Sequence, residues 1–477
     1  MQNRTIHSPF IARTAALLAC VFSAGCATGP SRPASDASAE TPAFVVLGAG
    51  GAAHARLVTR ERSCPVMLVD GRATPMAVRV PYGAIPVRPG ADPALAGAPN
   101  SAVLTCELAL PAGTRSASVR GQQLALPVAA PRRLVVLGDT GCRIKKQTVQ
   151  DCNDPDSYPF ARVAAAAAAW KPELVVHVGD YHYREDPCPA GLPGCAGSPW
   201  GYGWDAWRAD FFAPGAALLR AAPWVMTRGN HESCARAGQG WWRYLDPQPY
   251  LAQRNCDLPA GDAVADHAEP YAVPLGGDAQ LIVFDTSNTN WRGLPESDPR
   301  RARYRDTWRA IARFASGASY NIGVDHHPLF AFGANQDAKT GKLSLFGGDK
   351  GLLDAFGDMD KGYLPPSIAM LLSGHVHLWE QLSFSSRHPT QLVSGFSGTA
   401  EDTVPLPAAI PPGSEPAPGA VVEHFSSWVD GFGFMTLERL GAASWEVGVW
   451  DRHGQRRNRC TVEGSKSRCD LAQVSGK

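Results

Sequence analysis

The stretch Leu134-Val135-Val136-Leu137-Gly138-Asp139-Thr140-Gly141 determines the fold prediction, and Leu174-Val175-Val176-His177-Val178-Gly179-Asp180-Tyr181-His182-Tyr183 repeats its form. In both, a short apolar run typical of a buried strand ends abruptly in Gly-Asp. Three later apolar runs end in polar blocks: Gly229-Asn230-His231-Glu232, Asp325-His326-His327-Pro328 and Gly374-His375-Val376-His377. Because the carboxyl ends of such strands meet along one edge of an α/β sheet, we expect the five blocks to converge.

The segments between these runs have the Ala, Leu and Arg content of helices that cover a sheet. Helices are predicted over 158–170, 205–222 and 298–315, and two late strands over 433–437 and 445–450. The fold class is therefore α/β and layered, and the catalytic domain is predicted to span residues 131–477.

The residue types in the five blocks indicate a metal site. Carboxylate and amide oxygens suit hard cations, imidazoles suit borderline transition metals, and a phenolate suits ferric iron. The predicted ligands are Asp139, Asp180, Tyr183, Asn230, His326, His375 and His377. Any one of them alone is more often a cap or a packed side chain, but together they have no common stabilising role. Two ions roughly 3.5–4 Å apart would clamp a phosphate oxygen and activate water.

In order and spacing, the five blocks resemble the calcineurin-like metallophosphoesterases, and within them the purple acid phosphatase branch. The resemblance covers Asp139 to His377, about half of the chain. It implies a metallophosphoesterase β-sandwich flanked by helices, and a phosphoester hydrolase with two metal ions. Other members of the superfamily usually carry Asp-x-His in the first block, whereas Gly141 stands at that place here.

The same resemblance implies a role for each ligand. Asp139, Tyr183 and His377 would hold the first ion, expected to be iron, and Asp180 would bridge. The second ion, expected to be Fe, Zn or Mn, would be held by Asn230, His326 and His375.

Residues beside the ligands are candidates for catalysis and substrate binding. His231 is predicted to be the general acid, with Glu232 orienting it. Four arginines lie near the blocks, and a guanidinium fork fits phosphate oxygens, although each arginine alone is more often structural. The preferred substrate contacts are Arg143, Arg236 and His327.

The first residues have the pattern of an export signal over 1–26, with Arg4 and Arg13 ahead of the apolar run 14–22. Cys26 resembles the lipidated cysteine of a bacterial lipoprotein, followed by a tether over 27–42. We expect a periplasmic or membrane-anchored lipoprotein, with simple cleavage and secretion as the alternative.

Ten cysteines remain after the signal, and an oxidising compartment favours disulfides between sequence neighbours. The predicted pairs are 64–106, 142–152, 188–195, 234–256 and 460–469, formed by Cys64, Cys106, Cys142, Cys152, Cys188, Cys195, Cys234, Cys256, Cys460 and Cys469. A zinc-thiolate site is less consistent with the sequence, which lacks close Cys-x-x-Cys clusters.

Residues 43–130 contain short apolar runs separated by turns, as in a small all-β, sandwich-like accessory domain. This segment carries no cluster of ligand-type residues. The net charge of +1 and the absence of a basic block indicate no nucleic-acid-binding surface.

The predicted activity is hydrolysis of a small phosphomonoester. A phosphodiesterase or nucleotidase with the same site is the alternative within catalysis. A non-catalytic surface binding protein that retains the fold is the alternative of another class.

Overall fold

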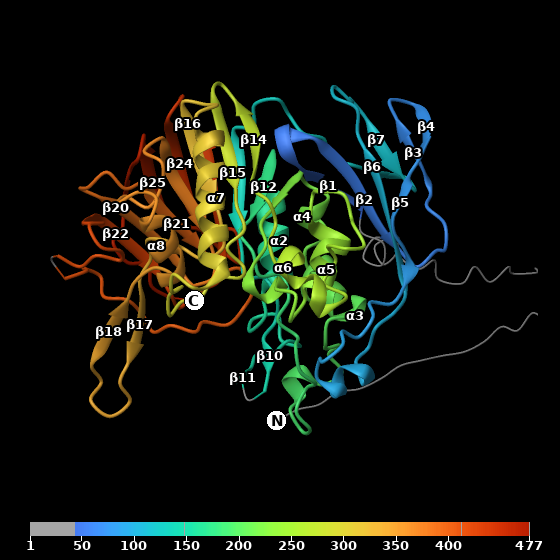
Figure 1. The fold of residues 1–477 in the computed structure, drawn as a ribbon, viewed down its shortest axis with the longest axis horizontal. Helices are drawn as coiled ribbons and strands as arrows, with labels where there is room; N and C mark the ends of the chain where they lie inside the picture. The colour runs from blue at the N-terminus through green and yellow to red at the C-terminus, as the bar shows by residue number, and fades with distance from the viewer. Residues whose placement is uncertain (1–42, 147, 412, 477) are drawn as a thin grey trace, which may run out of the picture.

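The computed structural model describes residues 43–146, 148–411 and 413–476 (Figure 1). The predicted export signal, the lipidation site Cys26 and the tether lie outside these residues. Within the described ranges, no helix has both the length and the apolar character needed to cross a bilayer.

Two large sheets form the centre of the molecule. The first has eleven strands, in the spatial order β26 (Lys466–Cys469), β25 (Arg456–Glu463), β24 (Ser444–Asp451), β23 (Gly433–Arg439), β9 (Arg133–Leu137), β12 (Leu174–His177), β13 (Trp224–Met226), β1 (Ala43–Leu47), β2 (Ala53–Thr59), β6 (Val103–Ala109) and β5 (Ala77–Gly83). The second has seven, in the order β14 (Tyr271–Gly276), β15 (Ala279–Val283), β16 (Tyr320–Val324), β19 (Ile368–Ser373), β21 (Thr390–Ser394), β20 (Trp379–Phe384) and β22 (Val422–Trp428).

The two sheets pack face to face through alternating side chains. Leu134 and Val136 of β9 share one buried cluster with Ile322 and Val324 of β16. The intervening Val135 points to the opposite face, as the two-residue period of a strand requires, and joins a second apolar cluster. The core therefore lies between the sheets, and each outer face needs a cover.

Helices cover the outer faces. α2 (Phe160–Ala169) packs on the eleven-stranded sheet, while α7 (Pro299–Ala315) and α8 (Lys350–Gly357) pack on the seven-stranded sheet. α7 begins where predicted, because Asp298 accepts the N–H of Arg300 and Pro299 occupies the first turn. The layered α/β prediction is confirmed (Figure 1).

The predicted helix over 205–222 is broken into short pieces. α3 (Trp204–Trp207), a π-type turn η4 (Arg208–Phe212) and α4 (Ala216–Leu219) replace it, because Pro214 and Gly215 interrupt the helical hydrogen bonds. The other short helical segments are η1 (Ala49–Gly51), η2 (Pro93–Gly97), η3 (Pro193–Cys195), η5 (Asn230–Glu232), α5 (Gly238–Gly240), η6 (Trp241–Leu245), η7 (Pro259–Gly261) and α6 (Asp262–Ala265).

The N-terminal region is all-β, as predicted, but its strands continue the large sheet. β1 pairs in parallel with β13, and β2, β6 and β5 follow outward from it. A separate four-stranded sheet holds β4 (Arg72–Pro75), β3 (Val66–Val69), β7 (Ala117–Val119) and β8 (Gln122–Gln123). The sheet is thus continuous across the predicted boundary at residue 130.

Buried arginines fasten this region to the rest of the chain. Arg56 donates to the carbonyls of Tyr244 (2.9 Å) and Asp246 (3.0 Å), and Arg79 donates to that of Trp242 (3.0 Å). Glu107 pairs with both guanidinium groups. Three of these contacts therefore join strands before residue 110 to the segment that follows the Asn230 block.

All five predicted disulfides are present, between Cys64 and Cys106, Cys142 and Cys152, Cys188 and Cys195, Cys234 and Cys256, and Cys460 and Cys469. A β-hairpin that the sequence analysis does not predict is formed by β17 (Gly333–Gln336) and β18 (Leu343–Phe346). A second small hairpin joins β10 (Ile144–Lys145) and β11 (Thr148–Val149). The β17–β18 hairpin projects from the lower left of Figure 1.

Candidate metal centre

The five polar blocks meet where parallel strands of both sheets end. β9, β12 and β13 are mutually parallel, as are β16 and β19, so their carboxyl ends lie at one edge. Asp139 and Asp180 both have left-handed backbone, with φ of 56° and 58°, which aspartate tolerates better than most residues. This conformation turns the chain sharply after each strand.

The Tyr183 hydroxyl is the centre of a first group of predicted ligands. It lies 2.9 Å from Asp139 Oδ1, 2.8 Å from Asp180 Oδ2 and 2.9 Å from His377 Nε2. All four side chains are buried. Residues separated by more than 230 positions in the sequence therefore present donor atoms to one point.

Asn230 is the centre of a second group. Its Oδ1 lies 3.0 Å from His326 Nε2 and 3.0 Å from His375 Nδ1. Asp180 Oδ2 is 3.2 Å from His326 Nε2 and also belongs to the first group. The structure thus brings all seven predicted ligands together, with Asp180 between the two groups.

The donor set fits metal ions. Donor atoms of Asp139, Asp180 and His326 lie within 4.8 Å of one another, as do those of His326, His327 and His375. Burial lowers the pKa of His326, but Asp180 raises it to about 10, so without a cation this imidazole would carry the charge that the carboxylates require. Carboxylate, phenol, amide and imidazole groups together suit a transition metal.

Backbone carbonyls orient two of the histidines. His326 Nδ1 lies 2.8 Å from the Val178 carbonyl, and His377 Nδ1 lies 2.8 Å from the Ala400 carbonyl. A carbonyl only accepts, so each Nδ1 carries a proton and each Nε2 is directed at the centre, where it would bind a metal ion in place of a proton.

Gly141 makes room for Tyr183. A Cβ at position 141 would lie 2.9 Å from Tyr183 Cδ2 and 2.9 Å from its backbone nitrogen, closer than side chains pack. The phenol can therefore occupy its place only because residue 141 has no side chain.

Two buried carboxylates brace the ligand loops. Asp210 accepts the backbone N–H groups of Cys142 (3.0 Å), Tyr183 (2.7 Å) and Arg184 (3.0 Å), and pairs with the Arg184 guanidinium at 2.6 Å. Glu232 accepts N–H groups from Asp180, Tyr181, His182 and Gly229. Burial and the charge of Asp180 raise the pKa of Glu232 to about 8.

The segment that contains these seven side chains also identifies the protein family. A model of the calcineurin-like phosphoesterase family matches residues 132–378, more than half of the 477 residues. The chain belongs to the calcineurin-like phosphoesterase family. Among curated protein sequences, no match reaches significance.

Three solved structures match this chain at low sequence identity. Purple acid phosphatase PPD1 from yellow lupin (Lupinus luteus) seeds is 12% identical, with 89% of this chain and 73% of that chain covered and a TM-score of 0.49. PhoD is 14% identical, with 92% and 94% covered and a TM-score of 0.49. GAP50, the anchor in the inner membrane complex of Plasmodium, is 12% identical, with 71% and 90% covered and a TM-score of 0.37. Sequence identities this low support no statement about the activity of this chain.

In this calcineurin-like phosphoesterase, the His231 ring packs against the Tyr183 ring at a tilt of 35°, with ring centroids 3.8 Å apart. Its Nδ1 is 2.9 Å from the His182 carbonyl and 3.1 Å from Glu185 Oε1, and its Nε2 is 3.9 Å from Asp180 Oδ2. Burial and the nearby Arg236 lower the pKa of His231 to about 4.

Glu232 does not have the predicted role of orienting His231. Among the described residues, its carboxylate oxygens accept backbone N–H groups, and Glu185 contacts the His231 ring instead. The reason is geometric: the turn η5 directs Glu232 back toward the Asp180 loop, whereas Glu185 follows that loop and faces His231.

The predicted substrate contacts lie near the centre in different settings. Arg236 pairs with Glu185, and its Nη2 lies 2.6 Å from His231 Nδ1. Arg143 Nη2 lies 3.1 Å from His377 Nδ1 and 3.3 Å from Asp402 Oδ2. The His327 ring lies 4.1 Å from the His375 ring, and its Nδ1 has no hydrogen-bond partner in the described residues. Their roles toward a substrate remain predictions.

Sequence reasoning missed Glu185, Asp210 and Asp402. Glu185 stands two positions after Tyr183, so proximity to a ligand was an available signal. Asp210 and Asp402 lie within segments without a ligand block, and no local pattern indicates their contacts. Three tryptophans that follow ligand blocks in the sequence, Trp204, Trp241 and Trp242, are all buried and pack the interior.

Proposed function

We propose that this chain is a phosphoester hydrolase with two metal ions, and specifically a phosphomonoesterase of the purple acid phosphatase type. The observation that carries the proposal is the Tyr183 hydroxyl, within 2.9 Å of donor atoms of Asp139, Asp180 and His377. A phenol among carboxylate and imidazole donors is a site for ferric iron.

Asp139, Tyr183 and His377 would hold iron, and Asn230, His326 and His375 would hold the second ion, which is Fe, Zn or Mn. Asp180 would contact both ions, because its Oδ2 lies near both groups. The ions would polarise a phosphoryl oxygen and activate a water molecule for in-line attack.

The chain's own residues would bind the phosphate and manage the leaving group. Arg143 and Arg236 lie at the edge of the centre, where a guanidinium fork can bind non-bridging oxygens. His327 would contact the phosphate from the side of the second group. His231 would give a proton to the leaving oxygen from Nε2 in its doubly protonated form, because its Nδ1 proton faces the His182 carbonyl and Glu185, which position the ring. Its pKa, lowered to about 4, restricts this form to acid pH.

The test is metal analysis of protein purified without chelator, together with a visible spectrum and activity on 4-nitrophenyl phosphate. About two metals per chain and a tyrosinate-to-iron absorption band are expected. The matched variant is Tyr183→Phe, which should lose the band and keep the fold. One zinc per chain and no band would remove the iron assignment.

Activity on bis(4-nitrophenyl) phosphate and on nucleotides distinguishes the monoesterase from a phosphodiesterase or a nucleotidase. Fully metallated protein that turns over none of these substrates would support the non-catalytic alternative. Faster hydrolysis of the diester than of the monoester would overturn the monoesterase assignment.

We also propose that the protein is exported and anchored through a lipid on Cys26. The five disulfides support an oxidising compartment. Mass spectrometry of the protein from membrane and soluble fractions would detect a lipidated Cys26, and an unmodified, soluble mature chain would overturn the anchor.

A further inference from the structure

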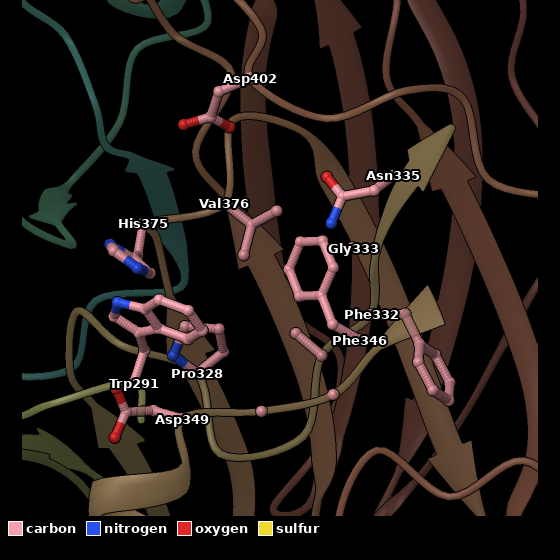
Figure 2. Close-up of a pocket in the computed structure, with 13 residues that line it drawn as sticks. Trp291, Pro328, Phe332, Gly333, Asn335, Phe346, Asp349, His375, Val376 and Asp402 are labelled. Carbon is pink, nitrogen blue, oxygen red and sulfur yellow. The ribbon is translucent and has the colours of Figure 1, made fainter. Parts of the chain in front are cut away.

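We propose that a cavity beside His375 binds the leaving group of the substrate and selects phosphoesters whose leaving group carries an uncharged aromatic ring. This inference rests on the proposed function, because it takes the metal centre as the place where the phosphate lies. The cavity has a volume of about 550 Å³ and is shown in Figure 2.

The cavity is continuous with the candidate metal centre. His375 is both a predicted ligand and part of the cavity wall. Val376 stands between the two ligands of the last block, and Pro328 stands two residues after His326. A phosphate held at the centre would therefore have one ester oxygen within reach of this wall.

Two aromatic rings border the cavity and are unusually open to solvent. Trp291 is 69% exposed and Phe346 is 43% exposed, although large aromatic side chains are normally buried. In Figure 2 both rings border the same space as His375. The Arg292 guanidinium lies 4.8 Å from the centroid of the Trp291 ring and packs on one of its faces. Open ring faces beside a reactive centre fit a flat apolar group.

The described lining residues provide no cation for an anionic leaving group. None of the thirteen lining residues that the structure describes is Lys or Arg, whereas Asp349 and Asp402 each bring a carboxylate. The nearest guanidinium groups are already engaged, Arg143 with Asp402 at 3.3 Å and Arg292 with the Trp291 ring, so a second phosphate or a carboxylate in the leaving group would compete for them. Polyphosphates and bisphosphates therefore fit this cavity less well than a neutral aromatic ester.

The hairpin that carries Phe346 is fixed relative to the metal centre. Gly333 pairs with Phe346 across the hairpin, and a Cβ at Gly333 would overlap the Phe346 ring. At the base, Asp349 N–H donates to the Pro328 carbonyl at 3.1 Å, and Ala334 N–H donates to Thr403 Oγ1 at 2.9 Å. The ring is thus held in place before a substrate arrives, which lowers the entropic cost of binding.

The experiment compares two substrates with leaving groups of similar basicity, 2-(1-naphthyl)ethyl phosphate and ethyl phosphate. Both release a primary alkanol, so the ratio of their kcat/KM values reports binding of the ring. The metal-loaded wild-type protein should favour the naphthyl substrate by about tenfold to a hundredfold, the range for filling an apolar pocket. Trp291→Ala and Phe346→Ala should each lower this ratio by roughly fivefold or more.

Leu343→Ala is the matched control. Leu343 lies three residues before Phe346 on the same strand, is 41% exposed and points to the other face of the hairpin. The ratio should be unchanged in this variant. Thermal unfolding of all three variants identifies any loss of folding.

A wild-type ratio near one, or a ratio that survives both aromatic substitutions, overturns the inference. Hydrolysis of ethyl phosphate tests the proposed function separately, because that substrate does not need the cavity. If neither ester is hydrolysed, calorimetric titration with 2-(1-naphthyl)ethylphosphonate and ethylphosphonate decides. Equal affinities for the two phosphonates would then overturn the inference.

Discussion

The two halves of the candidate metal centre differ in how they are held. Four predicted ligands, Asp139, Asp180, Tyr183 and Asn230, follow strands of the eleven-stranded sheet, where the buried Asp210 and Glu232 fix their loops through backbone N–H groups. The three histidines follow strands of the seven-stranded sheet. Among them, His375 also borders the open cavity.

This difference suggests a division between the chemistry of the site and its choice of substrate. The half on the larger sheet is enclosed, so the positions of its donor atoms depend on buried hydrogen bonds that are costly to lose. In the half on the smaller sheet, His326 and His377 are buried as well, but His375 borders the open cavity, where the other lining side chains can change without removing a ligand. We expect the first half to set the chemistry and the second to set the choice of substrate.

The largest effect is expected from Asp180→Ala, which removes the ligand that the Tyr183 group and the Asn230 group share. Asp180 Oδ2 lies close to both Tyr183 and His326, so its loss removes a donor from each group. Activity on 4-nitrophenyl phosphate should fall roughly a thousandfold, because metal ions stabilise the transition state by several kcal/mol. Elemental analysis should show fewer than two metals per chain. Full metal content in this variant would show that the two groups of ligands do not share Asp180.

A smaller effect is expected from Asp210→Asn, which tests the enclosed half. The change leaves the buried Arg184 guanidinium without its anionic partner and turns an amide N–H toward backbone donors. Stability measured by denaturant unfolding should fall by about 3–5 kcal/mol. Metal affinity measured by competition with a chelator should fall by about 10–100-fold.

The control for this variant is Asp306→Asn. Asp306 has a 73% exposed side chain and one ion pair, with Arg309 in the same helix. Its replacement should change stability by less than about 0.5 kcal/mol. Equal behaviour of the two variants would mean that the enclosed half is not braced.

The smallest effect is expected from Asp402→Asn, on the open side. The Asp402 carboxylate is 40% exposed and lies 3.5 Å from His377 Nδ1, which already faces the Ala400 carbonyl. The same chelator competition should show a loss of metal affinity of about tenfold or less. Stability should change by about 1 kcal/mol at most. A loss as large as that of Asp210→Asn would remove the distinction between the halves.

The sequence predicted the parts of the site that local pattern controls. A polar block after an apolar run, such as Gly-Asp, indicates both the end of a strand and a possible metal ligand. The seven side chains predicted in this way do converge in the structure. Disulfides between sequence neighbours and the start of α7 at Asp298-Pro299 are similarly local. Whether the seven side chains bind metal remains a prediction.

The rest depends on contacts between distant segments. Asp210 reads as an ordinary charged residue in a helical stretch, and its contacts with Cys142 and Tyr183 have no sequence signal. The parallel pairing of β1 with β13 joins segments about 180 residues apart, so the continuity of the sheet was not predicted. The β17–β18 hairpin was missed because its polar turn resembles a loop.

The missing side chain at Gly141 has a consequence for how such a centre can evolve. A residue with a Cβ at 141 would collide with Tyr183, so a histidine there and a tyrosine at 183 are mutually exclusive in this backbone. If Gly141 is replaced first, the new side chain collides with Tyr183. If Tyr183 is replaced first, the centre loses one donor. The two positions are therefore epistatic, and a lineage that exchanges one ligand type for the other must pass through an impaired ancestor or change both together.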